Sequence, residues 1–140
     1  MRDLDRTRRL VALRRRLEDQ RRGALLRAEA EVRAADAGLR EAVLAREAFA
    51  RSLTRVGAEA AGALSRTSSD ADAAQEEVRR RSQDVEGRRG EADVARAALA
   101  DASRSTKALE RAFGRLARER RAALARREQQ LLDELAARAV

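Results

Sequence analysis

The sequence has no proline, cysteine, histidine, tryptophan or tyrosine, and only two of its 140 residues are phenylalanine. Without proline, no side chain forbids very long uninterrupted helices. The absence of cysteine excludes disulfides and thiolate metal sites, and the absence of histidine removes the commonest general base and metal ligand. We therefore expect a helical protein with no metal site and no cofactor.

Charged residues make up 40% of the chain, and most of the remainder is alanine and leucine. This composition is typical of a coiled coil or a long helix rather than of a large globular core. No run approaches the roughly 18 apolar residues that a membrane-spanning helix needs. The first residues are rich in arginine and lack the apolar stretch of a secretory signal. We expect a cytoplasmic protein.

Small and apolar residues recur every seven positions, with a second series three places after the first, which is the pattern of a coiled-coil seam. In the first half the series hold Leu25, Val32, Leu39, Leu53 and Ala60, then Ala28, Ala35, Ala42, Phe49, Val56 and Ala63. In the second half they hold Val78, Val85, Ala92, Leu99 and Phe113, then Ala95, Ala102, Leu109 and Leu116. We expect Leu10, Leu13 and Leu17 to join the first seam through two four-residue steps.

Between the two seams lies SRTSSDAD, residues 65–72, in which hydroxyls and aspartates replace apolar residues. Ser69 and Asp72 resemble a helix capping box, and Asp70 suits a first helical turn. The sequence therefore predicts an all-α fold, a long antiparallel two-helix coiled-coil hairpin. We expect a single domain over residues 1–140, with one helix over about 3–64, a turn at about 65–70 and a second helix over about 71–138.

Folding at that turn would pair residues whose numbers add up to about 135. Leu4 would then lie near Leu131, and Phe49 near Glu86. The alternative is one continuous helix in a homodimer, in which the turn-forming residues would have no purpose.

Positive charge gathers toward both ends of the chain. Residues 1–27 carry a net charge of +6 and residues 104–138 carry +5, whereas residues 28–103 carry −3. A hairpin would bring the two basic segments to one end.

The sequence offers little for catalysis. Two long helices provide no concave, water-excluding pocket for a pair of carboxylates, and the glycines form neither a dinucleotide-binding motif nor a P-loop. We expect neither enzymatic activity nor a small-molecule substrate. The arginine clusters could contact phosphates, but the near absence of aromatic side chains argues against a nucleic-acid-binding module.

The C-terminal RREQQLLDELAARA, residues 126–139, places Asp133 and Glu134 near a helix end, where cations would suit the helix dipole better. Two explanations are open. In the first, Glu134 pairs with Arg138 at i,i+4, and Asp133 pairs with Arg2 or Arg6 on the other helix. In the second, Asp133 and Glu134 together serve as a docking group for a partner.

The chain resembles the FliJ/YscO family of flagellar and virulence type III export proteins. Relatives share its length and hairpin pattern and end with a similar C-terminal motif, matched by Gln129, Gln130, Asp133, Glu134, Leu135, Ala136 and Arg138. The resemblance implies a role in flagellum biogenesis, protein export, motility and chemotaxis. Other readings are a structural coiled-coil adaptor and an arginine-rich nucleic-acid-binding protein.

The resemblance also implies partners. The terminal end would enter the hexameric export ATPase as a central stalk, using Arg8, Arg9, Arg15, Arg16, Asp133, Glu134 and Arg138. The other half would reach the membrane export gate, with Phe49 as a candidate contact that the heptad register places in the seam instead. Export chaperones would be further partners, and the protein would be peripheral at the cytoplasmic face of the cell membrane.

Overall fold

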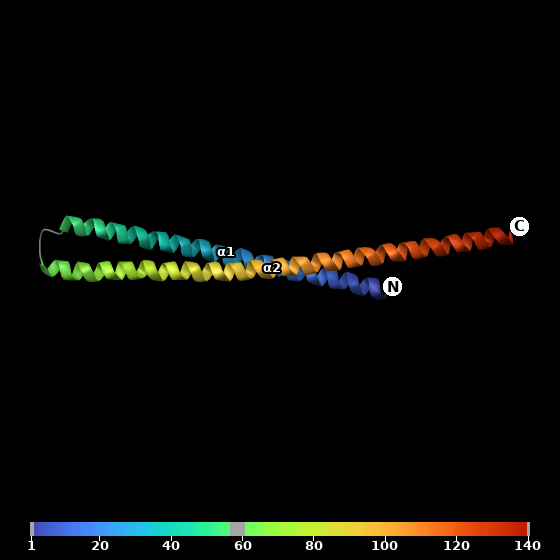
Figure 1. Ribbon diagram of the computed structural model, residues 1–140, viewed down its shortest axis with the longest axis horizontal. Helices are drawn as coiled ribbons and strands as arrows, with labels where there is room; N and C mark the ends of the chain where they lie inside the picture. The colour runs from blue at the N-terminus through green and yellow to red at the C-terminus, as the bar shows by residue number, and fades with distance from the viewer. Residues whose placement is uncertain (1, 57–60, 140) are drawn as a thin grey trace. The chain divides into compact units, whose positions relative to one another are not determined.

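A computed structural model describes residues 2–56 and 61–139 of the protein (Figure 1). The chain forms two helices, α1 over Arg2–Val56 and α2 over Ala61–Arg138. The helices pack against each other as an antiparallel hairpin, so the predicted all-α fold is confirmed. For residues 2, 55, 56 and 61–65 the helix is described but the side chains are not.

The hairpin divides into two compact units. The terminal unit comprises residues 1–21 and 99–140. The hairpin unit comprises residues 22–98. The terminal unit holds 18 basic and 10 acidic residues, and the hairpin unit holds 14 of each. The net charge of +8 therefore belongs entirely to the terminal unit.

The predicted turn at 65–70 is wrong, because those residues lie within α2. α1 ends at Val56 and α2 begins at Ala61, and residues 57–60 lie outside the described residues. Ser68, Ser69, Asp70 and Asp72 remain helical because they occupy exposed positions, whereas an inward-facing stripe continues at helical spacing through Thr67, Ala71, Ala74 and Val78. Polar residues lower helix propensity only slightly, and tertiary packing overrides that preference.

Moving the turn changes which residues face each other. The cross-helix ion pairs join Arg15 to Glu110, Glu31 to Arg88, Asp36 to Arg89 and Glu29 to Arg96, with residue numbers that add up to 119 or 125. The expected sum of 135, and with it the pairing of Leu4 with Leu131 and of Phe49 with Glu86, is therefore wrong.

The seam agrees with most of the heptad pattern. Leu116, a predicted seam residue, is 42% exposed, and the side chains of Val56, Ala60 and Ala63 lie outside the described residues. The buried apolar residues are Val11, Ala35, Val85, Ala92 and Ala102. Thr106 is also buried, at 3% exposure, at the heptad position between Leu99 and Phe113, and its Oγ1 donates a hydrogen bond to the carbonyl of Ala102 at 2.9 Å. Because none of the described side chains is fully buried and alanines fill much of the seam, the interface between the helices is thin.

Near the N-terminus, the predicted stutter is wrong. Leu10 is 42% exposed and Leu13 is 61% exposed, whereas Val11 is buried. Leu4, Val11 and Leu25 follow the unbroken seven-residue spacing of the rest of α1. The coiled-coil seam thus continues without the two four-residue steps, and the leucines at 10 and 13 face outward.

The end of α2 has no facing helix. Arg120 is half-buried, but every residue from Arg121 to Ala139 is exposed. The pairing of Arg15 with Glu110 explains this, because the same register places the start of α1 level with about residue 123 of α2. Figure 1 shows the C-terminal part of α2 continuing past the N-terminus of α1. We call residues 121–138 the uncovered segment.

Candidate protein-interaction surfaces

The described residues offer surfaces rather than an active site. Among them there is no cluster of three or more histidine, cysteine, aspartate or glutamate side chains fit for a metal ion. The hollows are open grooves, such as one in the terminal unit lined by Arg8, Val11, Ala12, Arg15, Glu110 and Phe113. None of the described helices combines the length and the apolar character needed to cross a membrane.

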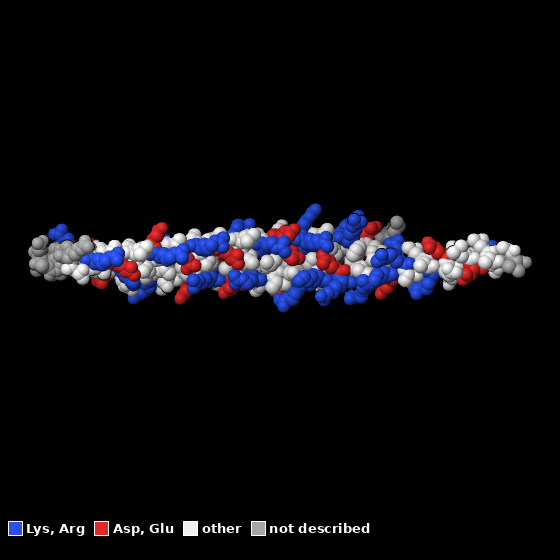
Figure 2. Space-filling model, turned by 90° about the horizontal axis from the view of Figure 1, so that it is seen from above, with Lys and Arg blue, Asp and Glu red and all other residues white. Residues whose placement is uncertain are grey.

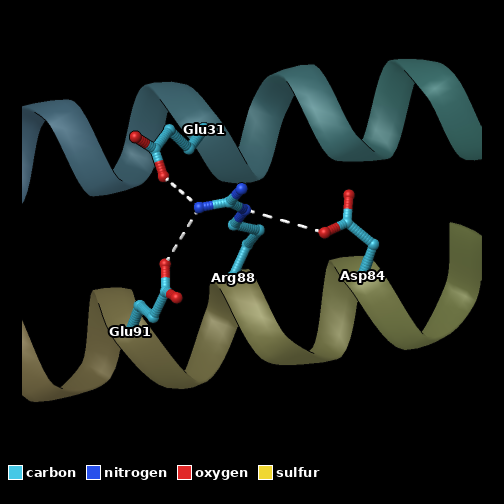
Figure 3. A network of polar contacts seen from close by, with 4 residues as sticks. All are labelled: Glu31, Asp84, Arg88 and Glu91. Carbon is cyan, nitrogen blue, oxygen red and sulfur yellow. Dashed lines mark hydrogen bonds and ion pairs between the residues drawn. The ribbon is translucent and has the colours of Figure 1, made fainter.

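The densest polar network surrounds Arg88 in the hairpin unit (Figure 3). Its Nη1 donates hydrogen bonds to Glu31 of α1 at 2.6 Å and to Glu91 at 3.3 Å, and its Nε lies 3.6 Å from Asp84. The carboxylate of Glu31, and next that of Glu91, raises the pKa of the Arg88 guanidinium above its ordinary value. Arg88 therefore stays charged at every physiological pH, and the network holds α1 and α2 in register.

Further cross-helix contacts flank this network. Arg89 bonds to Asp36 at 3.3 Å, Arg96 to Glu29 at 3.4 Å, and Arg46 to Gln75 at 3.2 Å. Arg46 interrupts the apolar series of α1, and its half-buried side chain reaches a polar group on the other helix. Because identical heptads leave several registers open, such pairs select one of them.

The basic candidates on α1 differ in their surroundings. Arg15 bonds to Glu110 across the terminal unit, with Nε at 2.8 Å and Nη2 at 2.7 Å from the same carboxylate oxygen. Arg8, Arg9 and Arg16 are exposed and form no ion pair within the described part of the chain. These three guanidinium groups are therefore free to meet a partner, whereas Arg15 already has a partner within the chain.

The acidic candidates lie on the uncovered segment. Asp133 accepts a hydrogen bond from Gln129 at 2.9 Å. The expected ion pair between Glu134 and Arg138 is absent from the described residues, so that prediction is wrong. The expected contact of Asp133 with Arg6 is also wrong, because the register set by Arg15 and Glu110 places Arg6 level with about residue 119. At 1.5 Å per residue, Asp133 is roughly 20 Å farther along α2.

The seven predicted ATPase-facing residues thus do not form one cluster. Arg8, Arg9, Arg15 and Arg16 lie where α1 and α2 run side by side, and the C-terminal three lie on α2 alone. Phe49 is half-buried in the hairpin unit at its predicted seam position, with its carbonyl accepting a hydrogen bond from Ser52 at 2.8 Å.

Four leucines of the uncovered segment were not predicted as an interaction surface. Leu124, Leu131, Leu132 and Leu135 are 49%, 60%, 60% and 63% exposed. Their spacing at seven and four residues marks one helix face, and that signal is present in the sequence. The sequence spacing does not reveal that these leucines are exposed, because their exposure depends on where α1 begins relative to α2.

The geometry defines a helical-hairpin interaction protein with a basic terminal unit and an uncovered helix end. The family model of the flagellar FliJ protein matches residues 4–140, and the chain belongs to this family. No curated protein and no solved structure matches the chain. Membership implies a component related to flagellar, type III protein export, in a family whose role there is not catalytic.

Proposed function

We propose that the protein is a stalk of the flagellar export machine, which inserts its terminal unit into the central opening of the hexameric export ATPase. The observation that carries this proposal is the uncovered segment, a single helix whose side chains all face solvent or a partner. A lone helix is narrower than a hairpin, which suits entry into the centre of a ring.

Charge supports the same orientation. The whole net charge of +8 lies in the terminal unit, and the hairpin unit is neutral. An acidic opening of the ring would attract the terminal unit more strongly than it attracts the rest of the chain. Arg8, Arg9 and Arg16 would be unpaired cations beside that opening. Asp133, Glu134 and Arg138 would then supply the specific contacts near the end of α2.

The hairpin unit would serve the remaining partners. Its surface alternates basic and acidic side chains (Figure 2), which suits selective contacts more than general attraction. We assign the membrane export gate and the export chaperones to this unit. Phe49 remains a candidate gate contact through the part of its ring that is not buried. Through the gate the protein would be peripheral at the cytoplasmic face of the membrane, and its loss would impair motility and, with it, chemotaxis.

The experiment is the rate of ATP hydrolysis by the export ATPase encoded with this protein, at about 150 mM salt, where surface attraction is screened beyond roughly 8 Å. We expect wild-type protein to stimulate the rate. We expect Asp133→Lys with Glu134→Lys to stimulate less, with unchanged helicity. The matched control is Asp70→Lys with Asp72→Lys, which makes the same charge change at exposed positions of the hairpin unit.

Three results would contradict the proposal in part or in whole. Equal stimulation by wild type and by the Asp133 and Glu134 double variant would remove the docking role of this pair. No stimulation by any of the proteins would remove the stalk role and favour a structural adaptor. If binding to random DNA is as strong as binding to the ATPase and falls steeply between about 50 and 200 mM salt, the basic terminal unit serves nucleic acid instead.

A further inference from the structure

The uncovered segment carries an apolar stripe that begins where α1 ends. At 3.6 residues per turn, Leu124, Leu131 and Leu135 lie within about 40° of one another around α2, and Leu132 lies beside them. Phe113 and Ala117, which are half-buried in the terminal unit, lie on the same face. The stripe is therefore a continuation of the seam beyond the point where the chain supplies a facing helix.

We propose that a second copy of this chain supplies the missing helix, and that two uncovered segments pair antiparallel around a two-fold axis near residues 129 and 130. This proposal is independent of the stalk function. Overlap of the parts of the two segments that lie beyond the start of α1 sets the axis, because Leu124 of one copy then meets Leu135 of the other. Each copy's α2 continues the path of the other copy's α1.

The side chains agree with this register. Leu124 of one copy faces Leu135 of the other, and Glu128 faces Leu131. On one side of the apolar stripe, Arg127 of one copy lies within about two residues, measured along the helix, of the position opposite Glu134 of the second copy. The two-fold symmetry forms this pair twice. On the other flank, Ala125 and Leu132 of the two copies meet.

The same register also limits affinity. Eighteen residues of helix bury a small area compared with the roughly 1,200–2,000 Å² of stable interfaces. We therefore expect a weak, reversible dimer that forms at micromolar concentrations. Pairing covers Glu134 and the leucines, so the dimer and an ATPase-bound state exclude each other.

The absence of cysteine from the sequence allows a direct test of the geometry. Leu124→Cys protein mixed with Leu135→Cys protein should give a mixed disulfide dimer under mild oxidation. Leu124→Cys protein alone should not cross-link, because its two thiols would be offset by about 16 Å along the pair, beyond the reach of a disulfide. Efficient self-cross-linking of Leu124→Cys would indicate parallel helices and overturn the proposal.

Sedimentation equilibrium of the cysteine-free chain, over about 1–200 μM, tests the energetics. We expect Arg127→Glu alone and Glu134→Arg alone each to raise the dissociation constant about tenfold, which is about 1.4 kcal/mol. The combination of both substitutions should restore dimerisation, because the charges are exchanged on both copies.

Two controls separate this surface from general effects. Asp133→Arg changes another exposed charge, which lies about 100° farther around the helix from the stripe of Leu124, Leu131 and Leu135 than Glu134 does, and it should leave the dimer intact. Leu26→Asp removes a leucine of similar exposure, 59%, from the hairpin unit and should also have no effect. Leu131→Asp should abolish dimerisation. A wild-type chain that stays monomeric at 200 μM, or a charge exchange that fails to rescue, would refute the proposal.

Discussion

Arg15 and Glu110 join the two helices of the terminal unit through one carboxylate oxygen, which accepts a hydrogen bond from Nε at 2.8 Å and lies 2.7 Å from Nη2. The Arg15 side chain is 65% exposed and that of Glu110 is 37% exposed. Water therefore screens the pair, and its contribution to stability is small. Its position nevertheless shows the register of the two helices in the terminal unit, which places the start of α1 level with about residue 123 of α2.

A double-mutant cycle tests this pair. We expect Arg15→Ala and Glu110→Ala each to lower the free energy of unfolding by less than about 1 kcal/mol, with a coupling energy of about 0.2–1 kcal/mol. The measurement is urea unfolding followed by circular dichroism. Arg16, which is exposed and has no described ion pair, supplies the control, since Arg16→Ala combined with Glu110→Ala should show no coupling. Additive effects in both cycles would mean that the Arg15 contact does not form in solution.

Glycine in the interior of α2 offers a stabilising change. Gly87 and Gly90 are helical, and a Cβ added at either position would meet nothing within 4 Å. Replacement by alanine should raise the free energy of unfolding by up to about 1 kcal/mol per site, because alanine has the higher helix propensity. Gly38→Ala should gain less, since the new Cβ would lie 3.2 Å from Nη1 of Arg81. Thermal melts of the three variants give the order, and a larger gain at Gly38 would contradict the packing described here.

The same valine-to-alanine substitution should have different effects on stability at a buried and at an exposed position of α2. Val85 is 3% exposed and Val94 is 71% exposed, and both lie in α2 of the hairpin unit. Val85→Ala removes two buried methyl groups and should cost about 1–2 kcal/mol of unfolding free energy. Val94→Ala should be neutral or slightly stabilising, because an exposed position gains from the helix propensity of alanine. Equal losses at the two sites would show that Val85 does not face α1.

Heptad spacing predicted the seam because it depends only on which side of a helix each residue occupies. Ala35, Val85, Ala92 and Ala102 are buried as that spacing predicts. Among the described residues, Thr106 is the polar side chain that is buried at a heptad position. The backbone carbonyl of Ala102 satisfies the hydroxyl, so a polar side chain fits the seam without a partner on α1.

The register could not be predicted in the same way. A seam that repeats every seven residues fits several alignments of the two helices, and the choice depends on contacts between residues far apart in sequence, such as Arg88 with Glu31. The cluster of hydroxyls and aspartates at 65–72 suggested a turn, but exposed helix positions tolerate these residues. The error of about ten residues in register concealed the uncovered segment and its exposed leucines.

Thr106 itself gives the sharpest test of the seam. Its side chain is buried, and its hydroxyl bonds only to a carbonyl that also belongs to the helix ladder of α2. Thr106→Val keeps the shape and replaces the hydroxyl by a methyl group, leaving no donor or acceptor without a partner. We expect the free energy of unfolding to stay equal or to rise by up to about 1 kcal/mol. Thr106→Ala, which leaves a gap instead, should be less stable than Thr106→Val by about 1–2 kcal/mol. Urea unfolding measures the stability of the two variants. If Thr106→Ala is as stable as Thr106→Val, residue 106 does not pack against α1 and the heptad series does not pass through it.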